Sequence, residues 1–291
     1  MNMFEGASVA LITPFTKDDR VDLEGLKRNI DYVIEGGVSS IVPCGTTGES
    51  ATLTFEEHKE VIRTAVEHSS VPVIAGTGSN NTAEALELTR FAADVGADAA
   101  LVITPYYNKP NPQGLIRHYE EIEKCDIPIV LYNIKSRTGL NIPPELMAEL
   151  ASHEGIIGVK EASGDLGQVS RIIELTQDED FFVISGDDAL TLPIMVLGGI
   201  GVISVAANVV PSMVSSLTSA MLEGRYEEAR RIHYELAPLI RALFIETNPI
   251  PVKRACELMG LAAGHLRLPL ASLSEEHEAM LRAEMERLAL I

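Results

Sequence analysis

Short apolar runs, each bounded by turn-forming residues, recur along the first two thirds of the chain. They alternate with longer segments in which apolar residues recur at helical spacing. The runs lack strict apolar–polar alternation, as expected for strands that are covered on both faces. The sequence therefore predicts eight parallel strands, within residues 8–13, 39–44, 71–76, 98–104, 127–132, 155–160, 181–186 and 200–205.

The segments between the runs carry signals for the start and the end of helices. Asp22 precedes a helical pattern that ends at Gly36, and the sequence TFEE at residues 54–57 predicts a capping box. One strand with its helix spans about 30 residues, the length of a βα repeat. Eight such units without a GxGxxG fingerprint favour an α/β fold of the (β/α)8 TIM barrel type over an open sheet. Further helices are predicted near residues 212–222, 226–245, 250–259 and 274–288.

This pattern divides the chain into two parts. Residues 1–210 are assigned to the barrel strands and most of its helices, and residues 211–291 to the last barrel helix and a helical C-terminal extension. The run from Ala189 to Leu222 has no charged residue, and about 20 apolar residues suffice to span a membrane. Glycines and prolines interrupt the run, so a buried helix, a glycine turn and a buried strand explain it better.

Composition and charge narrow the classes of function. The chain has 291 residues, 46% of them hydrophobic, and a formal net charge of −19, which would repel nucleic acid and anionic membranes. Cys44, Cys125 and Cys256 lie far apart and offer neither a zinc motif nor a disulfide framework. The N-terminus has no basic region before its short apolar run, so it does not resemble a secretory signal. We therefore expect a cytoplasmic protein.

In a barrel of this kind the active site lies at the carboxyl ends of the strands. The residues at or just beyond the predicted strand ends are therefore the first candidates for chemistry. They are Thr13, Thr46, Thr47, Ser79, Asn80, Tyr106, Tyr107, Tyr132, Asn133, Lys160, Glu161, Gly186, Asp187, Asp188, Ser204 and Val205.

Lys160 is the most informative of these residues, because it ends an apolar strand where an ammonium group is poorly solvated. Desolvation that lowered its pKa to about 7.5 would leave roughly a quarter of the molecules with a free amine at pH 7. Such an amine can form a Schiff base with a carbonyl substrate. The alternative is that Lys160 pairs with Glu161 or another carboxylate. Tyr132 ends the preceding strand and could relay protons in the same cavity, or could be a packed tyrosine with a satisfied hydroxyl.

Two further segments offer groups that bind carboxylates. The glycines of GTTGES, which begins at Gly45, can turn backbone N–H groups and the hydroxyls of Thr46 and Thr47 toward a carboxylate, or can simply form a tight turn. The segment lacks the GxxxxGK pattern of a nucleotide-binding loop. Arg137, just past the fifth strand, offers a bidentate partner for a carboxylate, with a merely solvated arginine as the alternative.

Metal catalysis and phosphate binding are disfavoured. The histidines fall in predicted helices or loops away from the strand ends, and neither HxH nor HExxH spacing occurs. The segments after the seventh and eighth strands lack an obvious glycine nest with a basic partner. We therefore expect no metal site and a substrate that is not held by a phosphate group.

Together, the motifs resemble those of the dihydrodipicolinate synthase family, within the pyruvate-dependent class I aldolases. The resemblance covers essentially the whole chain, and eight motifs in the same order are far more specific than any one of them. They are GTTGESATL from Gly45, AGTGSNNTAEA from Ala75, TPYYNKP from Thr104, YNIKSRTG from Tyr132, GVKEASGD from Gly158, SGDDAL from Ser185, GVISVAAN from Gly201 and NPIPVKRA from Asn248.

The resemblance implies a lyase that condenses pyruvate with L-aspartate 4-semialdehyde to 4-hydroxy-tetrahydrodipicolinate, in the diaminopimelate route of lysine biosynthesis. Lys160 would form the Schiff base with pyruvate, so no metal or organic cofactor would be needed. Thr46, Tyr132 and Tyr107 would relay protons, with Tyr107 reaching the site of a neighbouring subunit. The implied substrate-binding residues are Thr47 and Arg137 for the carboxylates of the two substrates, and Gly186 and Ile203 beside pyruvate.

The same resemblance implies a homotetramer, a dimer of dimers, whose tight dimer takes part in catalysis. The closest rival is a sister aldolase that acts on N-acetylneuraminate or 2-keto-3-deoxygluconate and would need to recognise a polyol. Arg137 and the Thr46-Thr47 pair favour the synthase. A rival of another class is a catalytically silent barrel used for binding or regulation, which would be expected to lose the lysine, tyrosine or threonines that this chain retains.

Two positions depart from the family pattern. Lys135 stands where proline is common, although Arg137 is still in place. Phe55 replaces a histidine often found where L-lysine inhibits sensitive members. That inhibitor site would map to Ser50, Ala51, Phe55, His58, Asn80, Glu84 and Tyr106. The alternative is that these residues are surface residues at a dimer interface.

Overall fold

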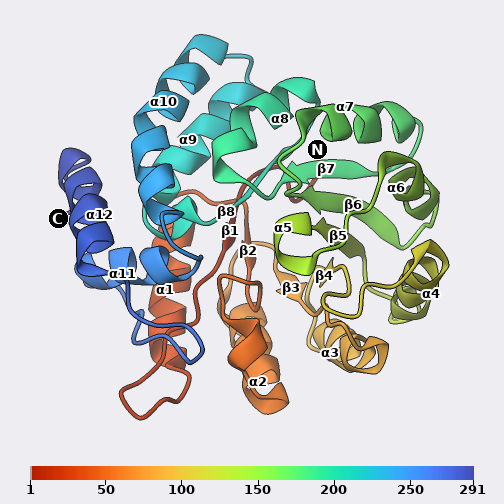
Figure 1. Cartoon of the computed structure of the whole chain (residues 1–291), viewed down its shortest axis with the longest axis horizontal. Coiled ribbons are helices and arrows are strands. Elements are labelled where there is room, and N and C mark those ends of the chain that lie inside the picture. Colours follow the sequence, from red (N-terminus) through yellow and green to blue (C-terminus); the bar gives the residue numbers. More distant parts are fainter. Residues whose placement is uncertain (1) are drawn as a thin grey trace.

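The computed structural model describes residues 2–291. Within this range eight parallel strands form one sheet in the order β2-β1-β8-β7-β6-β5-β4-β3. A parallel bridge between Ile41 and Val73 links β2 to the start of β3, so the sheet closes into a nearly complete barrel (Figure 1). The strands are β1 (Gly6–Ala10), β2 (Ser40–Val42), β3 (Ile74–Gly76), β4 (Ala99–Ile103), β5 (Ile129–Asn133), β6 (Ile156–Glu161), β7 (Phe182–Ser185) and β8 (Gly201–Ser204).

Helices between the strands cover the outside of the barrel, and the last helices lie together on one side of it (Figure 1). This arrangement confirms the predicted (β/α)8 barrel with a helical C-terminal extension. The helices are α1 (Leu23–Glu35), α2 (Phe55–His68), α3 (Thr82–Asp94), α4 (Pro112–Glu123), α5 (Lys135–Thr138), α6 (Pro144–Ala151), α7 (Leu166–Leu175), α8 (Thr191–Leu197), α9 (Pro211–Leu222), α10 (Tyr226–Leu243), α11 (Ile250–Leu258) and α12 (Glu275–Arg287).

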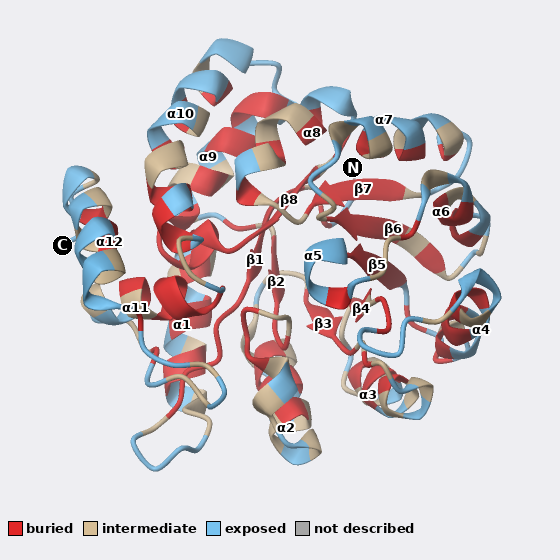
Figure 2. Cartoon of the chain, viewed as in Figure 1, coloured by how far each residue is buried: buried red, intermediate tan, exposed pale blue. Residues whose placement is uncertain are grey.

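Side chains alternate between the barrel interior and the surrounding helix layer. Along β5, Val130 and Tyr132 belong to the inner apolar cluster, whereas Ile129 and Leu131 belong to the outer one. The strands are buried almost throughout, and the helices turn their exposed faces outward (Figure 2). The same alternation in β6 directs the side chain of Val159 toward the helix layer and that of Lys160 into the barrel.

Two helix starts that the sequence predicts are present. The carboxylate of Asp22 accepts a hydrogen bond from the backbone N–H of Gly25 at the start of α1. Thr54 and Glu57 make both hydrogen bonds of the predicted capping box at the start of α2. The box satisfies donors that the first turn of a helix leaves free, and it fixes where the chain leaves the GTTGES segment.

The charge-free run folds as the sequence predicts. It forms α8, a turn at Gly198 with φ of 115°, and the buried strand β8. None of the described helices is both long and apolar enough to cross a membrane.

The C-terminal extension packs against the barrel face that carries the strand ends. The Asn29 side chain of α1 donates to the carbonyl oxygen of Ala262 at 2.6 Å, and the backbone N–H of Phe15 donates to the carbonyl oxygen of Ala263 at 3.2 Å. Within the extension, Arg254 of α11 pairs with Glu278 of α12 at 2.7 Å. These contacts bring α11 and the segment after it beside the loops where the sequence predicts the active site.

Candidate active site

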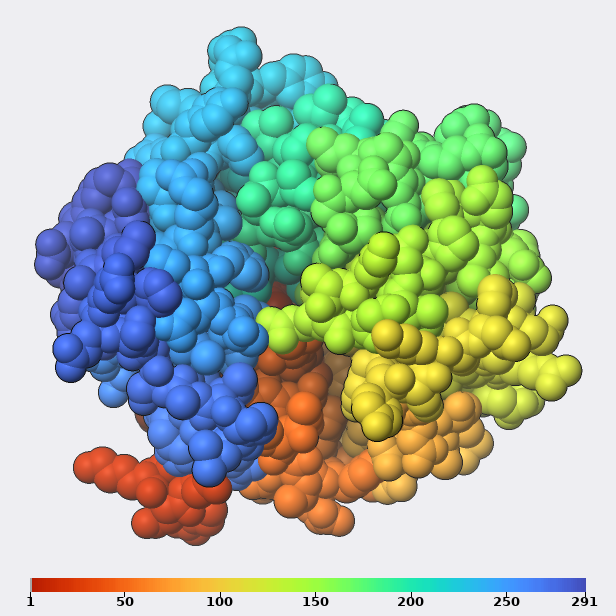
Figure 3. Space-filling model, in the orientation of Figure 1, coloured from red at the N-terminus to blue at the C-terminus, as the bar shows by residue number. Residues whose placement is uncertain are grey.

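A cavity of about 500 Å³ opens at the carboxyl ends of the strands. Figure 3 shows it as a hollow where the orange, lime-green and blue parts of the chain meet. Its lining joins segments that are far apart in the sequence. Four of the predicted strand-end residues line it, Thr46, Ser79, Tyr106 and Tyr132, and Lys160 lies against the ring of the last of these. The lining comes mainly from residues 44–46 and 49–55, from 76, 78 and 79, from 101, 103 and 106, from 132, 137 and 138, and from 248 and 249.

Lys160 lies near the end of β6. It is not itself part of the cavity lining but packs against Tyr132, which is. Its side chain is buried, with 5% of its surface exposed, and its Nζ lies 4.4 Å from the centre of the Tyr132 ring. Burial lowers the pKa of Lys160 to about 8; Asp188 acts in the opposite direction, and Arg137 adds to the lowering. The carboxylate of Glu161 accepts hydrogen bonds from Asn133 and the backbone of Ser163. These contacts and the alternation of side chains along β6 direct Glu161 away from Lys160, and the carboxylate that does act on Lys160 is that of Asp188.

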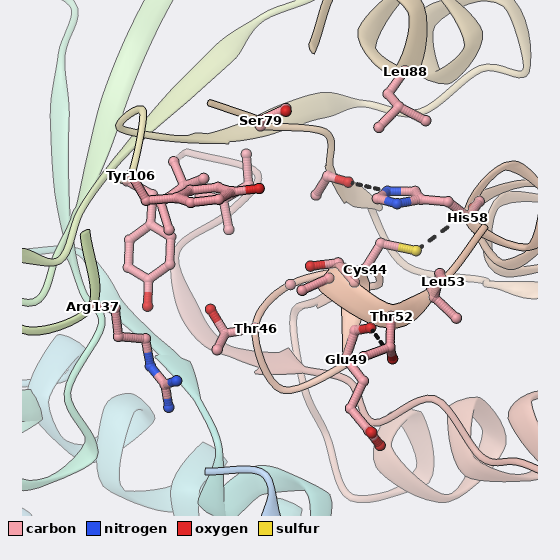
Figure 4. A pocket seen from close by; sticks show the side chains of 18 of the residues that line it. Cys44, Thr46, Glu49, Thr52, Leu53, His58, Ser79, Leu88, Tyr106 and Arg137 are labelled. Atoms are coloured by element: carbon pink, nitrogen blue, oxygen red, sulfur yellow. Dashed lines mark hydrogen bonds between the residues drawn. The ribbon is translucent and has the colours of Figure 1, made fainter. Parts of the chain in front are cut away.

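Tyr132 ends β5 directly beside Lys160, because the two residues are partners in the parallel ladder. Burial raises the pKa of Tyr132 to about 12, whereas Arg137 and a hydrogen bond with Thr46 act in the opposite direction. The phenol is therefore protonated at neutral pH and can donate a proton. Thr46 and Arg137 line the same cavity as Tyr132, and Figure 4 shows the two side chains near one another.

The GTTGES turn is held by a residue from the far end of the chain. The Nδ2 of Asn248 donates to the Thr47 hydroxyl at 2.9 Å, and the Arg137 guanidinium donates to the Asn248 carbonyl oxygen at 2.8 Å. The Oδ1 of Asn248 is buried without a hydrogen-bond partner among the described residues, so it can accept from a bound ligand. The sequence analysis did not single out Asn248 as a site residue, although it opens the NPIPVKRA motif.

Gly186 and Ile203 shape the wall around Lys160. A Cβ atom at Gly186 would lie 3.0 Å from Cγ and Cε of Lys160 and 2.9 Å from Cβ of Ala162, closer than ordinary contacts allow. Glycine therefore leaves the lysine room to extend. Ile203 of β8 is buried in the inner apolar cluster and contributes to the dry surroundings.

Comparisons with known proteins agree with this geometry. A family model described as the dihydrodipicolinate synthetase family matches residues 3–288. The chain belongs to this family. It is 63% identical to a 4-hydroxy-tetrahydrodipicolinate synthase of Methanosarcina mazei, over 99% of this chain and 100% of the relative.

Solved structures of dihydrodipicolinate synthases have the same fold. The enzyme from Aquifex aeolicus matches with a TM-score of 0.96 and 49% identity, over 99% of each chain. A structure from Cyanidioschyzon merolae with lysine bound matches with a TM-score of 0.96 and 41% identity, over 100% of each chain. The family expected from the sequence motifs is therefore confirmed.

Tyr107, expected from the dihydrodipicolinate synthetase resemblance to act in catalysis, is exposed on the surface of the single chain. It has a positive φ of 69°, its surface is 90% exposed, and it does not line the cavity. Its neighbour Tyr106 lines the cavity instead. A role for Tyr107 in catalysis would require that it reach the cavity of another subunit.

Six of the seven residues expected to bind L-lysine in sensitive dihydrodipicolinate synthetases line the same cavity. Glu84 is oriented by the Ser79 hydroxyl, which donates to its carboxylate at 2.8 Å, and the Nε2 of His58 lies 2.7 Å from the carbonyl oxygen of Gly76. Asn80 is the expected residue that does not line the cavity. The six are Ser50, Ala51, Phe55, His58, Glu84 and Tyr106.

Asp188 was among the strand-end candidates, but sequence reasoning gave it no role. It is buried, and its carboxylate accepts from the Ser204 hydroxyl and from the backbone N–H of Val205, the latter at 2.9 Å. It is also the acidic group that opposes the lowering of the pKa of Lys160. Among the described residues, no group of three or more His, Cys, Asp or Glu side chains could hold a metal ion.

Sequence reasoning also missed a buried ion pair behind the GTTGES turn. Lys253 of α11 donates to Glu49 at 2.7 Å and to the carbonyl oxygen of His265 at 2.6 Å, and its ammonium lies 4.3 Å from the centre of the Phe15 ring. Both charged side chains are almost fully buried. Glu49 directs its carboxylate away from the ring of His58 in Figure 4. A lysine within the apolar sequence IPVKRAC was the available signal.

Proposed function

We propose that this enzyme condenses pyruvate with L-aspartate 4-semialdehyde to give 4-hydroxy-tetrahydrodipicolinate, through a Schiff base on Lys160. The observation that carries the proposal is a buried lysine with a lowered pKa, placed against a tyrosine at the carboxyl end of a barrel strand. The family and the name of its relative from Methanosarcina mazei support the choice of substrates. The reaction would serve the diaminopimelate route of lysine biosynthesis in the cytoplasm.

The first half of the reaction joins pyruvate to the enzyme. The amine of Lys160 attacks the C2 carbonyl carbon of pyruvate, and the resulting carbinolamine takes up a proton on oxygen and loses water to give an imine that is protonated on nitrogen. Tyr132 and Thr46 are suited to carry these protons, because both line the cavity and Tyr132 lies against the lysine. The imine then loses a C3 proton to the same relay and becomes an enamine.

The second half makes a carbon–carbon bond and releases the enzyme. C3 of the enamine attacks the aldehyde carbon of the semialdehyde, and the aldehyde oxygen takes up a proton. The amine of the semialdehyde then attacks C2 of the regenerated imine, closes the ring and displaces the Lys160 amine. No oxidation or reduction occurs, and the covalent imine supplies the activation for which other enzymes use a metal or organic cofactor.

The remaining assignments follow the geometry of the cavity. Thr47, held by Asn248, would bind the pyruvate carboxylate, and Arg137 would bind the carboxylate of the semialdehyde. Gly186 and Ile203 would line the pyruvate site. The exposure of Tyr107 supports its insertion into the site of a neighbouring subunit, within a homotetramer built as a dimer of dimers.

Reductive trapping tests the proposed function directly. Borohydride added with pyruvate should add to the folded protein the mass of one pyruvate, less water and plus two hydrogens. Peptide mapping should place the adduct on Lys160 and not on Lys253, which is equally buried but ion-paired. Borohydride without pyruvate is the control, and an adduct that is absent or lies elsewhere would overturn the mechanism.

A coupled reductase assay with the semialdehyde then separates the synthase from a sister aldolase, which would instead release pyruvate from a sugar acid.

We also propose that L-lysine binds at the six cavity residues named above, together with Asn80. The shared cavity and the related structure with lysine bound support this assignment. The Glu84 carboxylate would pair with an amine of the ligand. Calorimetric titration with L-lysine should release heat with the wild-type protein and little with Glu84→Ala. Wild-type protein that shows no heat at millimolar lysine would instead favour a surface with no role in inhibition, in keeping with Phe55.

A further inference from the structure

The residues that directly follow Tyr132 and Lys160 form a second buried cluster on the other face of the sheet. β5 and β6 pair in register, with Tyr132 beside Lys160 and Asn133 beside Glu161. Because side chains alternate along a strand, Asn133 and Glu161 point away from the barrel interior. They are 0% and 1% exposed. A carboxylate so deeply buried needs strong hydrogen-bond donors.

The donors around Glu161 are all neutral. Its Oε2 accepts from Nδ2 of Asn133 at 2.9 Å, and its Oε1 accepts from the backbone N–H of Ser163 at 2.7 Å. Nε2 of Gln168, on the first turn of α7, lies 3.4 Å from each oxygen. The carboxylate therefore fixes three separate pieces of chain with respect to β6: the end of β5, the loop that follows β6, and the start of α7.

Asn133 is also hydrogen-bonded to the far end of the loop that follows β5. Its Oδ1 accepts from the backbone N–H of Ile142 at 3.0 Å, and its Nδ2 also donates to Oδ1 of Asn141 at 3.0 Å. Asn141 is bound in turn to Gln168, donating to its Oε1 at 2.8 Å. One buried amide thus joins the two ends of the loop formed by residues 134–141.

This loop carries Arg137 to the cavity. Its middle residues, Lys135 to Arg137, are exposed, and Thr138 makes its hydrogen bonds to Ile134 and Leu140 within the loop itself. The guanidinium itself donates to the carbonyl oxygen of Asn248 at 2.8 Å, and this contact can form only if the two ends of the loop hold Arg137 at the cavity.

We propose that Asn133 and Glu161 are positioning residues for Arg137, because their buried amide–carboxylate contact holds the 134–141 loop so that the guanidinium faces the cavity. The inference rests on the proposed function, in which Arg137 binds the carboxylate of the semialdehyde. Neither residue touches a substrate. Disturbing the contact should therefore impair the use of the semialdehyde more than it impairs imine formation with pyruvate, which depends on side chains inside the barrel.

Exchanging the two functional groups provides a reciprocal test. Glu161→Gln alone places an amide NH2 against a donor, and Asn133→Asp alone places two carboxylates together. Each single variant should raise the KM for the semialdehyde about tenfold or more, because a displacement of about 1 Å can cost up to 100-fold. The double variant restores a carboxylate–amide contact with its polarity reversed, and the carboxylate introduced at position 133 can still accept from the backbone N–H of Ile142. Its KM should return toward that of the wild type.

A second set of variants asks whether the effect passes through Arg137. In an Arg137→Ala background, Glu161→Gln should change the KM for the semialdehyde by less than about twofold, because the guanidinium that it positions is absent. The amount of pyruvate adduct trapped by borohydride should be the same with and without Glu161→Gln, both in the wild-type background and in the Arg137→Ala background. If Glu161→Gln fails to fold, Asn141→Ala loosens the half-buried edge of the same network and should show the same selective rise in KM.

The outcomes separate this inference from the proposed function. Additive effects of Glu161→Gln and Arg137→Ala, or a lower melting temperature with an unchanged KM, would overturn the positioning role and leave the Schiff-base mechanism intact. Absence of a trapped adduct in the wild-type protein would overturn the proposed function itself.

Discussion

Replacing Lys160 by methionine is expected to abolish turnover and, at the same time, to stabilise the protein. Methionine keeps the apolar stem of lysine but has no amine to form the imine. Loss of a covalent nucleophile should lower kcat by about 10⁴-fold or more. The trapped pyruvate adduct should disappear with it, whereas unchanged turnover would exclude Lys160 as the nucleophile.

The gain in stability follows from the direction of the pKa shift. Burial lowers the pKa of Lys160 from 10.5 to about 8, so the unfolded chain holds its proton more tightly than the folded protein does. Folding with a charged Lys160 therefore costs about 3 kcal/mol below pH 8, and this cost disappears as the pH rises toward 10.5. Urea unfolding should show Lys160→Met to be more stable than the wild type at pH 7, by a margin that shrinks near pH 10. A margin that is constant with pH would contradict this account.

The same substitution at Lys253 is expected to have the opposite effect on stability. Lys253→Met leaves the carboxylate of Glu49 buried, and among the described residues the backbone N–H of Arg267, at 3.1 Å, is then its one remaining donor. Breaking a buried ion pair in this way should lower the free energy of unfolding by about 3–5 kcal/mol. Urea unfolding at pH 7 measures the free energy of unfolding of Lys253→Met. Lys160→Met, measured in the same way, is the matched control.

A double variant distinguishes the broken pair from a simple packing defect. Burial lowers the pKa of Lys253 although Glu49 opposes the shift, so desolvation cancels much of the benefit of the pair. Replacing both charges, as in Glu49→Leu with Lys253→Met, should therefore recover most of the lost stability. If the double variant is as unstable as the single one, the loss comes from packing and not from the unpaired carboxylate.

Local sequence patterns predicted the parts of this protein that depend on near neighbours. Asp22 and Thr54 could be identified as helix caps because their partners lie three residues away. Lys160 and Tyr132 could be placed together because parallel strands end on the same side of a barrel. The βα repeat then determined which residues meet, without any knowledge of individual contacts.

The residues that sequence reasoning missed act over long separations. Asn248 lies 201 residues from Thr47, and Lys253 lies 204 residues from Glu49. Nothing near Glu49 in the sequence shows that its carboxylate is buried rather than solvated. Periodicity also could not show that the cluster behind Asn133 would be polar, because buried strand faces toward helices are ordinarily apolar.

The placement of Asn248 and Lys253 has a consequence for the order in which the protein is made. A nascent chain that has emerged as far as residue 240 contains every strand, together with Lys160 and Tyr132. It still lacks the partners of Thr47 and Glu49 on the GTTGES turn. Synthesis therefore completes the barrel before it completes the proposed pyruvate site. Lys160 is already in the chain before the residues that hold the GTTGES turn have been made.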